Sequence, residues 1–126
     1  MTAARSQPES VADGAVVTKA ALRAAAHLGV SNRSLARILG VSEATVSRMG
    51  AGTYVLKSED KAFELALMFL RVFRALDALA GGDAQTSRAW LRNENLALGG
   101  VPIVLIASLS GIINVVGYLD AQRAHG

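Results

Sequence analysis

The stretch Asn32–Met49, NRSLARILGVSEATVSRM, contains two short helical patterns separated by a glycine. Gly40 can adopt the positive φ that ends a helix sharply. Ser42 is a good N-cap for a second helix, and the acidic Glu43 behind it is favoured at the positive end of the helix dipole. The apolar side chains that would fill the wedge between the two helices have helical spacing: Leu35, Leu39, Val41 and Val46. The stretch therefore predicts two helices joined by a tight turn.

The second of these helices would expose short polar side chains and one arginine. They are Ser42, Glu43, Ala44, Thr45, Ser47 and Arg48. Such a face suits the major groove of DNA, where base edges and phosphates must be reached together. The spacing is that of a helix-turn-helix DNA-binding motif. The alternative is a two-helix corner in some other helical protein.

Two flanking sets of residues are candidate phosphate contacts. Asn32 and Arg33 lie in the first turn of the first helix, where exposed backbone amides favour an anion. Tyr54 and Lys57 follow the loop Gly50–Thr53 that leaves the second helix. For Tyr54 the alternative role is a half-buried anchor of that loop.

Composition favours an all-α protein with a real core. The chain has 126 residues, of which 52% are hydrophobic and only 5% aromatic, with two prolines. It has no cysteine, which excludes disulfides and cysteine-based metal sites and agrees with a reducing cytoplasm. The two histidines, His27 and His125, are far apart in sequence. We therefore expect no metal and no cofactor.

The positive charge is concentrated in the first half of the chain. Residues 1–57 carry seven basic and three acidic side chains, whereas residues 58–126 carry six basic and seven acidic ones. The basic half coincides with the helix-turn-helix, which favours a polyanion partner for that half. Residues 58–126 carry no such excess of positive charge, so their function has to be inferred from other features.

The chain divides into a leader and two parts. Residues 1–17 are predicted to be a flexible leader, since they mix polar residues with few large apolar ones. Residues 18–57 would form the helix-turn-helix domain, with Thr18 capping a first helix to about Leu28. Residues 58–126 would form a helical domain that begins with a long helix capped by Ser58. That helix has a wide apolar face from Phe63 to Leu79, which either contacts a second chain or belongs to the core of its own chain.

The last part of the chain is predicted to contain three short helices. The first runs from an Asp83 cap to Arg92, the second from Pro102 to about Ala107, and the third from Ile112 to about Gln122, after a break at residues 108–111. The second helix is so apolar that it should be buried nearly all round. The segment Asn95–Leu119 carries no charge, and its length could span a bilayer. Its polar residues and Gly-Gly-Val-Pro turn argue against that, so we expect no membrane partner.

The helix-turn-helix residues resemble the phage-repressor-like (Xre) family, and a second pattern extends the resemblance over about residues 58–122. This pattern comprises Trp90-Leu91, Asn93, Asn95, Leu98-Gly99-Gly100, Pro102, Leu105, Gly111, Val115 and Leu119. It is similar to the toxin-binding domain of the Xre/MbcA/ParS antitoxins. The resemblance implies an antitoxin that binds operator DNA and is paired with a RES-domain toxin that destroys NAD. Two places depart from the family pattern: Ser108-Leu109-Ser110, where a Thr and an acidic residue are expected, and the chain end from Ala121.

The candidate toxin-binding residues are Trp90, Asn93, Asn95, Gly99, Gly100, Pro102 and Arg123. Trp90 is either a partner anchor or a core tryptophan. The two asparagines could instead cap or brace the turn. Arg123 lies in a polar tail that could reach into an active site, or that could simply be a frayed terminus.

The sequence bears on three classes of function: an antitoxin, a stand-alone transcription regulator and an enzyme. An enzyme is disfavoured because the sequence has no Gly-rich phosphate loop, no Ser-His-Asp candidates, no metal cluster and no paired carboxylates in a cleft-like context. The alternative to an antitoxin is a stand-alone dimeric transcriptional repressor whose C-terminal half only dimerises or binds a ligand. In both cases we expect a homodimer, because repressors of this type commonly bind two half-sites.

Overall fold

The computed structural model describes the backbone of residues 2–125 and the side chains of residues 13–125. Within these residues the helices are α1 (Thr2–Leu28), α2 (Asn32–Leu39), α3 (Glu43–Ala51), α4 (Lys61–Leu79), α5 (Ala84–Arg92), α6 (Pro102–Leu105) and α7 (Leu109–His125). The only β pairing in this part of the chain is an isolated bridge between Asn95 and Gly100. The all-α class with an N-terminal helix-turn-helix is confirmed.

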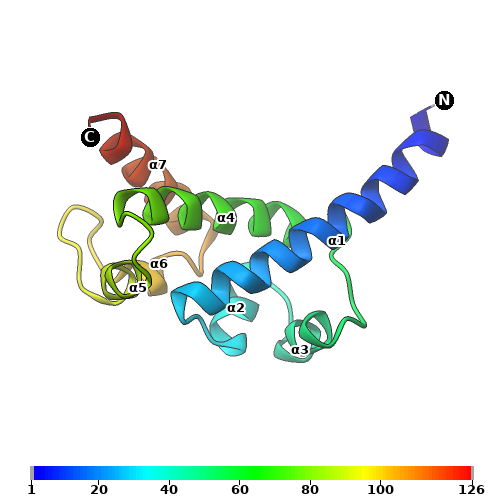
Figure 1. Cartoon of the computed structure of the whole chain (residues 1–126), viewed down its shortest axis with the longest axis horizontal. Helices are drawn as coiled ribbons and strands as arrows, with labels where there is room; N and C mark the ends of the chain where they lie inside the picture. Colours follow the sequence, from blue (N-terminus) through cyan, green and yellow to red (C-terminus); the bar gives the residue numbers. More distant parts are fainter. Residues whose placement is uncertain (1, 126) are drawn as a thin grey trace.

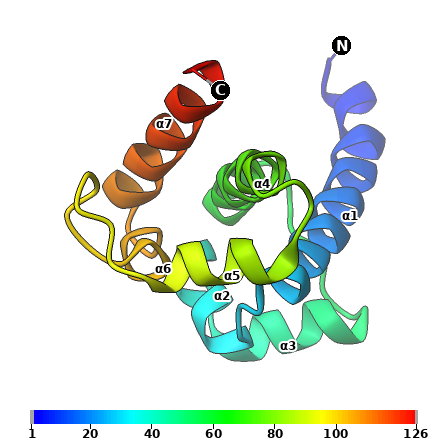
Figure 2. The same ribbon diagram turned by 60° about the vertical axis from the view of Figure 1, so that its left-hand side comes forward.

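Helix α4 is the centre of the arrangement. It packs against α1 and α7, and Figure 2 shows it between these two helices, with α5 and the α2–α3 pair beneath it. In Figure 1, α3 lies at the lower right while α5, α6 and the C-terminal end of α7 lie at the left. Helix α3 therefore lies apart from the C-terminal helices α5–α7, whereas α2 lies near them.

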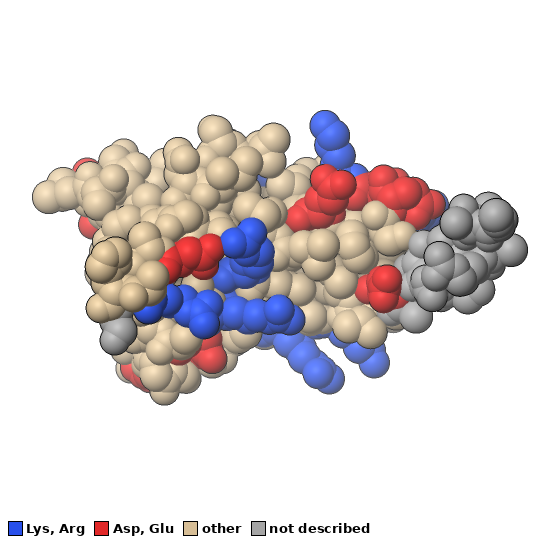
Figure 3. Space-filling model, turned by 90° about the horizontal axis from the view of Figure 1, so that it is seen from above, with Lys and Arg blue, Asp and Glu red and all other residues tan. Residues whose placement is uncertain are grey.

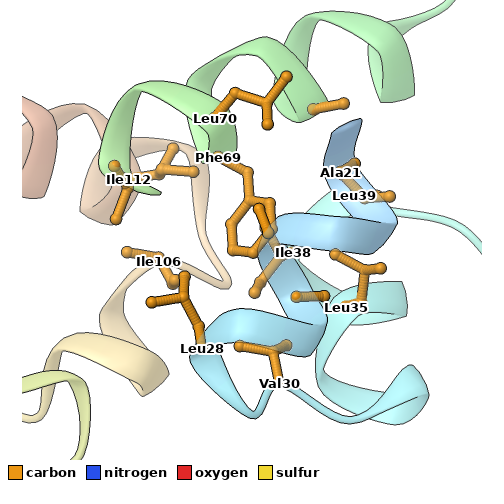
Figure 4. Close-up of a cluster of buried hydrophobic side chains, with 14 of the residues drawn as sticks. Ala21, Leu28, Val30, Leu35, Ile38, Leu39, Phe69, Leu70, Ile106 and Ile112 are labelled. Atoms are coloured by element: carbon orange, nitrogen blue, oxygen red, sulfur yellow. The ribbon is translucent and has the colours of Figure 1, made fainter. Parts of the chain in front are cut away.

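One hydrophobic core joins the N-terminal and C-terminal helices. Phe69 of α4 is fully buried, and Figure 4 shows apolar side chains from α1, α2 and the α6–α7 segment around its ring. The labelled neighbours include Ala21, Leu28, Ile38, Leu39, Ile106 and Ile112. Burying one such large side chain contributes about 1.5–3 kcal/mol. The N-terminal and C-terminal helices are thus held together by ordinary core packing.

Most of the wide apolar face of α4 belongs to this core. The residues of α4 buried within the chain are Ala66, Phe69, Leu70, Val72, Ala75 and Leu76. Leu67 and Leu79 are the large apolar side chains of α4 that are exposed, at 41% and 45%. Of the two alternatives for this face, intrachain core therefore accounts for the larger part.

The first helix begins much earlier than Thr18. Helix α1 runs from Thr2, through most of the predicted leader. Gly14 and Val17 are buried, and a Cβ at Gly14 would collide with the carbonyl oxygen of Leu56. Thr18 does not cap the helix, because its buried Oγ1 accepts a hydrogen bond from the N–H of Leu56 at 2.9 Å. This packing against the loop before α4 explains why Thr18 lies inside a helix, which its local sequence did not show.

Three other predicted helix ends were wrong. Helix α3 extends through Ala51, so the exit loop begins at Gly52, whose φ is +80°. Asp60, not Ser58, occupies the N-cap position of α4, because a turn with a 3.0 Å bond from the N–H of Asp60 to the Lys57 carbonyl precedes the helix. Helix α7 begins at Leu109, since the Ser108 hydroxyl accepts from the N–H of Gly111 at 3.1 Å.

Candidate functional site

Helix α3 presents the predicted DNA-contacting residues on its outer face. Val46 and Met49 are buried beneath it. The side chains that point away from the core and are exposed are Ser42, Glu43, Ala44, Ser47 and Arg48. Turn geometry fixes this orientation, because Gly40 has φ +72° and its N–H bonds back to the Ala36 carbonyl. The structure therefore brings five of the six predicted residues to one surface.

Thr45 has a different environment from its neighbours. It is half-buried, and its hydroxyl lies 2.9 Å from the Ser42 hydroxyl, with which it shares a hydrogen bond. The Ser42 hydroxyl also accepts from the N–H of Thr45 at 3.0 Å, which confirms Ser42 as the N-cap of α3. Thr45 thus contributes to the helix start as well as lying near the candidate DNA surface.

Basic side chains dominate the surface around α2 and α3. Between residues 32 and 57 the exposed charged side chains are Arg33, Arg37, Glu43, Arg48 and Lys57. Among the residues whose side chains are described, none of the four basic ones forms a salt bridge. The face made by α1, α4 and α7 is different, since Figure 3 shows basic and acidic side chains side by side there. The surface around α3 can therefore attract a polyanion more strongly than this mixed face.

The flanking phosphate candidates lie at the edges of α2 and α3. Ser31 caps α2 by accepting from the N–H of Ser34 at 3.1 Å, which leaves Asn32 and Arg33 exposed in the first turn. Lys57 is exposed, whereas Tyr54 is half-buried and packs against the core. Tyr54 therefore has the geometry of the loop anchor that the sequence left open as its alternative role.

The turn after α5 is held together by Asn95. Its backbone N–H donates to the carbonyl of Gly100 at 2.8 Å, and its side-chain Oδ1 accepts from the N–H of Leu98 at 3.0 Å. Gly99 has φ +78°, and its N–H donates to the Asn95 carbonyl at 2.9 Å. Asn95 therefore braces the turn, as its alternative role predicted. Asn93 is exposed at the end of α5, and Pro102 is buried at the start of α6.

Trp90 lies over α7 and is only half-buried. Its ring is stacked with that of Tyr118, with centroids 6.3 Å apart and planes at 23°. Beside the two rings is a small pocket of about 160 Å³ between α4, α5 and α7. Trp90 is thus neither a fully buried core residue nor a freely exposed one.

Asp83 starts the helix that carries Trp90. It accepts hydrogen bonds from the hydroxyl and the N–H of Thr86. These bonds, the side-chain bond first, hold the pKa of Asp83 below its ordinary value. The cap is therefore complete above the ordinary carboxyl pKa and is lost only as the pH falls through the lowered one.

Sequence reasoning missed two arginines that connect α5 to α1. Arg88 Nε and Nη2 donate to the carbonyls of His27 and Ala26 at 2.8 and 3.1 Å. Arg92 Nη1 and Nη2 donate to the carbonyls of Leu28 and Gly29 at 3.1 and 2.7 Å. The last carbonyls of a helix lack intrahelical partners, so these bonds cap the C-terminus of α1. The i, i+4 spacing of Arg88 and Arg92 is visible in the sequence, but the α1 carbonyls that they bind are not.

Family comparison identifies the N-terminal part. The Antitoxin Xre-like helix-turn-helix domain matches residues 7–71, more than half of the chain.

The chain belongs to the Xre-like helix-turn-helix antitoxins.

The antitoxin has a second family match at its other end. The Antitoxin Xre/MbcA/ParS C-terminal toxin-binding domain matches residues 75–124. The pair of matches assigns the chain to toxin–antitoxin systems, as an antitoxin with a DNA-binding domain. A comparison with curated proteins found no match. The division at residues 17 and 57 stays a prediction.

Within the described residues, no three His, Cys, Asp or Glu side chains are grouped so that they could hold a metal ion. In the same part of the chain, no helix has both the length and the apolar character needed to cross a membrane. The candidate sites therefore remain the α3 surface and the C-terminal helices.

Proposed function

We propose that the antitoxin represses its own operon and neutralises a RES-type toxin that degrades NAD. The observation that carries this proposal is the union in one chain of an exposed α3, within an Xre-like domain, and a toxin-binding domain. The Trp90–Leu119 pattern is the reason for naming a RES-type partner. Repression follows from the common arrangement in which such a protein binds the promoter of its own genes.

On DNA, α3 would enter the major groove. Arg48 and Ser47 are placed to reach base edges, while Glu43 and Ala44 lie at the N-terminal turn of the same exposed face. Phosphate contacts would come from the exposed Asn32, Arg33 and Lys57, with Tyr54 anchoring the loop that carries Lys57. Phosphate contacts fix the register of the protein on the duplex, whereas base contacts select the sequence.

We further propose that the antitoxin binds DNA as a homodimer. Because α4 is mostly used within its own chain, the interface should use exposed apolar side chains elsewhere in the C-terminal half. These side chains are Leu96, Val104, Leu109 and Ile113. A dimer would pair two α3 helices with two half-sites, which one helix-turn-helix alone cannot do.

Toxin inhibition would use both the turn after α5 and the end of α7. Asn93, Gly99 and Gly100 of the turn would face the toxin, while Asn95 and the buried Pro102 would hold the shape of the turn. Arg123 is exposed on the last turns of α7, which remain helical to His125. A plug would therefore be the end of a helix held by the core, with Arg123 able to pair with a carboxylate of the toxin.

Co-expression with the product of the neighbouring reading frame tests this function. That product alone should deplete cellular NAD, and the intact antitoxin should restore it. If Arg123 is part of the plug, Arg123→Ala should restore NAD less well than Arg74→Ala, which removes an equivalent exposed charge from α4. A neighbouring product that never lowers NAD would contradict the RES-type partner. If that product also fails to bind the chain, the stand-alone repressor becomes the better explanation.

A further inference from the structure

The pocket beside Trp90 lies between the C-terminal parts of α4 and α7 and one side of α5. Leu76, Leu79 and Ala80 come from α4 and the residue after it, Thr86 and Trp90 from α5, and Tyr118, Leu119 and Gln122 from α7. Leu76 and Leu119 are buried, whereas Leu79, Thr86 and Gln122 are exposed. The pocket thus has an apolar floor, two aromatic walls and an accessible rim.

The size and chemistry of the pocket limit what it can hold. Its volume of about 160 Å³ is below the roughly 300–1,000 Å³ typical of small-molecule sites. No charged side chain lines it, and the Thr86 hydroxyl is already bonded to Asp83. A nucleotide would find no room in the pocket, and a smaller anion would find no counter-charge. A single uncharged side chain fits both limits.

The position of the pocket indicates where that side chain comes from. All eight lining residues fall inside residues 75–124, the part that matches the toxin-binding domain. In Figure 1, α5 and the C-terminal ends of α4 and α7 lie at the left, whereas α3 lies at the lower right, so DNA bound along α3 would leave the pocket free. Leu79, 45% exposed at the rim, offers apolar surface to a protein partner.

We infer that this pocket receives one apolar or aromatic side chain of the toxin and is an anchor point of the complex. The inference rests on the proposed function and deepens it by naming a receptor site and the chemistry of its occupant. The rings of Trp90 and Tyr118 provide aromatic faces for edge or offset contacts. Anchors of this kind, in well-packed and desolvated pockets, dominate the energetics of protein interfaces.

A bulky side chain of the antitoxin itself, placed at the pocket, would compete with the toxin side chain and so tests the inference. Gln122 is exposed on α7, so Gln122→Phe places a ring at the rim without disturbing the core. Gln85→Phe makes the same chemical change on α5 at an exposed residue that does not line the pocket. The probe is the purified product of the neighbouring reading frame, titrated calorimetrically against the full antitoxin. Gln122→Phe should weaken the affinity about tenfold or more, while Gln85→Phe should stay close to the unmodified chain.

A second variant and a DNA titration complete the experiment. Leu79→Ala trims the rim and should also weaken toxin binding, while both pocket variants keep the DNA affinity and thermal stability of the unmodified protein. If Gln122→Phe and Leu79→Ala bind the toxin like the unmodified chain, the pocket is not the receptor, although the proposed function stands. If the unmodified chain does not bind the product at all, the proposed function fails and this inference fails with it.

Discussion

Arg48 and Thr45 both lie on α3, but only Arg48 is fully available to DNA. The Thr45 hydroxyl is engaged with Ser42 in the helix cap, so replacing it would change α3 itself. Arg48 is exposed and could fork onto a guanine. We expect Arg48→Ala to weaken specific binding by about 1–3 kcal/mol in a mobility-shift titration on the protein's own promoter. Arg123→Ala, with the same loss of charge far from α3, is the control, and an equal loss for both would contradict base reading by Arg48.

Arg92 has a structural role that its exposed location would not suggest. Its guanidinium donates to the carbonyls of Leu28 and Gly29, which end α1. Arg92→Met keeps much of the aliphatic stem but loses these bonds, and the freed carbonyls can be rehydrated at the surface. We expect the free energy of unfolding to fall by about 1 kcal/mol, measured by urea denaturation. Arg37→Met on α2 is the control, because Arg37 has no salt bridge among the described side chains, and it should change stability by much less.

At the scale of helices, two glycines of α7 should respond oppositely to alanine. A Cβ at Gly111 would collide with the backbone carbonyl of Leu105, where α6 turns tightly into α7. Gly117 is exposed, and a Cβ added there would meet no atom within 4 Å beyond the backbone of its own helix. Gly111→Ala should destabilise the protein by about 1–3 kcal/mol, because a backbone neighbour cannot step aside as a side chain can. Gly117→Ala should stabilise it by about 0.4–1 kcal/mol. Thermal unfolding of both variants and the unmodified protein measures the two changes.

Helix ends that depend on nearby residues could be predicted from the sequence. The caps at Ser31, Ser42 and Asp83 were correct, because each bonds an amide only three residues away. Thr18 was wrongly predicted as a cap because its hydroxyl is bonded to Leu56, 38 residues away, which the sequence does not show. Ser58 was wrongly predicted as a cap because a turn from Lys57 to Asp60 precedes α4. The short apolar helix α6 was expected to be buried all round, yet Val104 is 68% exposed.

The candidate sites also differ in how far the sequence could predict them, because some depend on one helix and others on contacts between distant segments. The exposed face of α3 follows from periodicity within one helix, so the sequence was enough. The pocket beside Trp90 also requires Leu76 and Tyr118 from two other helices. No local sequence pattern predicts that these three helices pack together there. The arginine caps on α1 also join segments more than sixty residues apart.

At the scale of the whole molecule, we expect two chains in solution. The exposed Leu109 and Ile113 lie one helical turn apart on α7, in a segment without charge. Light scattering at micromolar concentration should give twice the mass of the chain, and Ile113→Lys should shift the protein to the monomer. Leu67→Lys, at an exposed apolar residue of α4, is the matched control and should leave the dimer intact. A monomeric unmodified protein would contradict the homodimer.

The caps that Arg88 and Arg92 place on α1 also bear on the order of events during synthesis. The carbonyls at the end of α1 are made early, whereas the guanidinium groups that satisfy them are 61–64 residues further along the chain. Ile112, which packs in the same core, emerges from the ribosome later still. The DNA-binding end therefore cannot reach its final stability while the chain is still being translated. A nascent chain arrested before Asp83 should be cut by proteases near the end of α1, whereas the released protein resists.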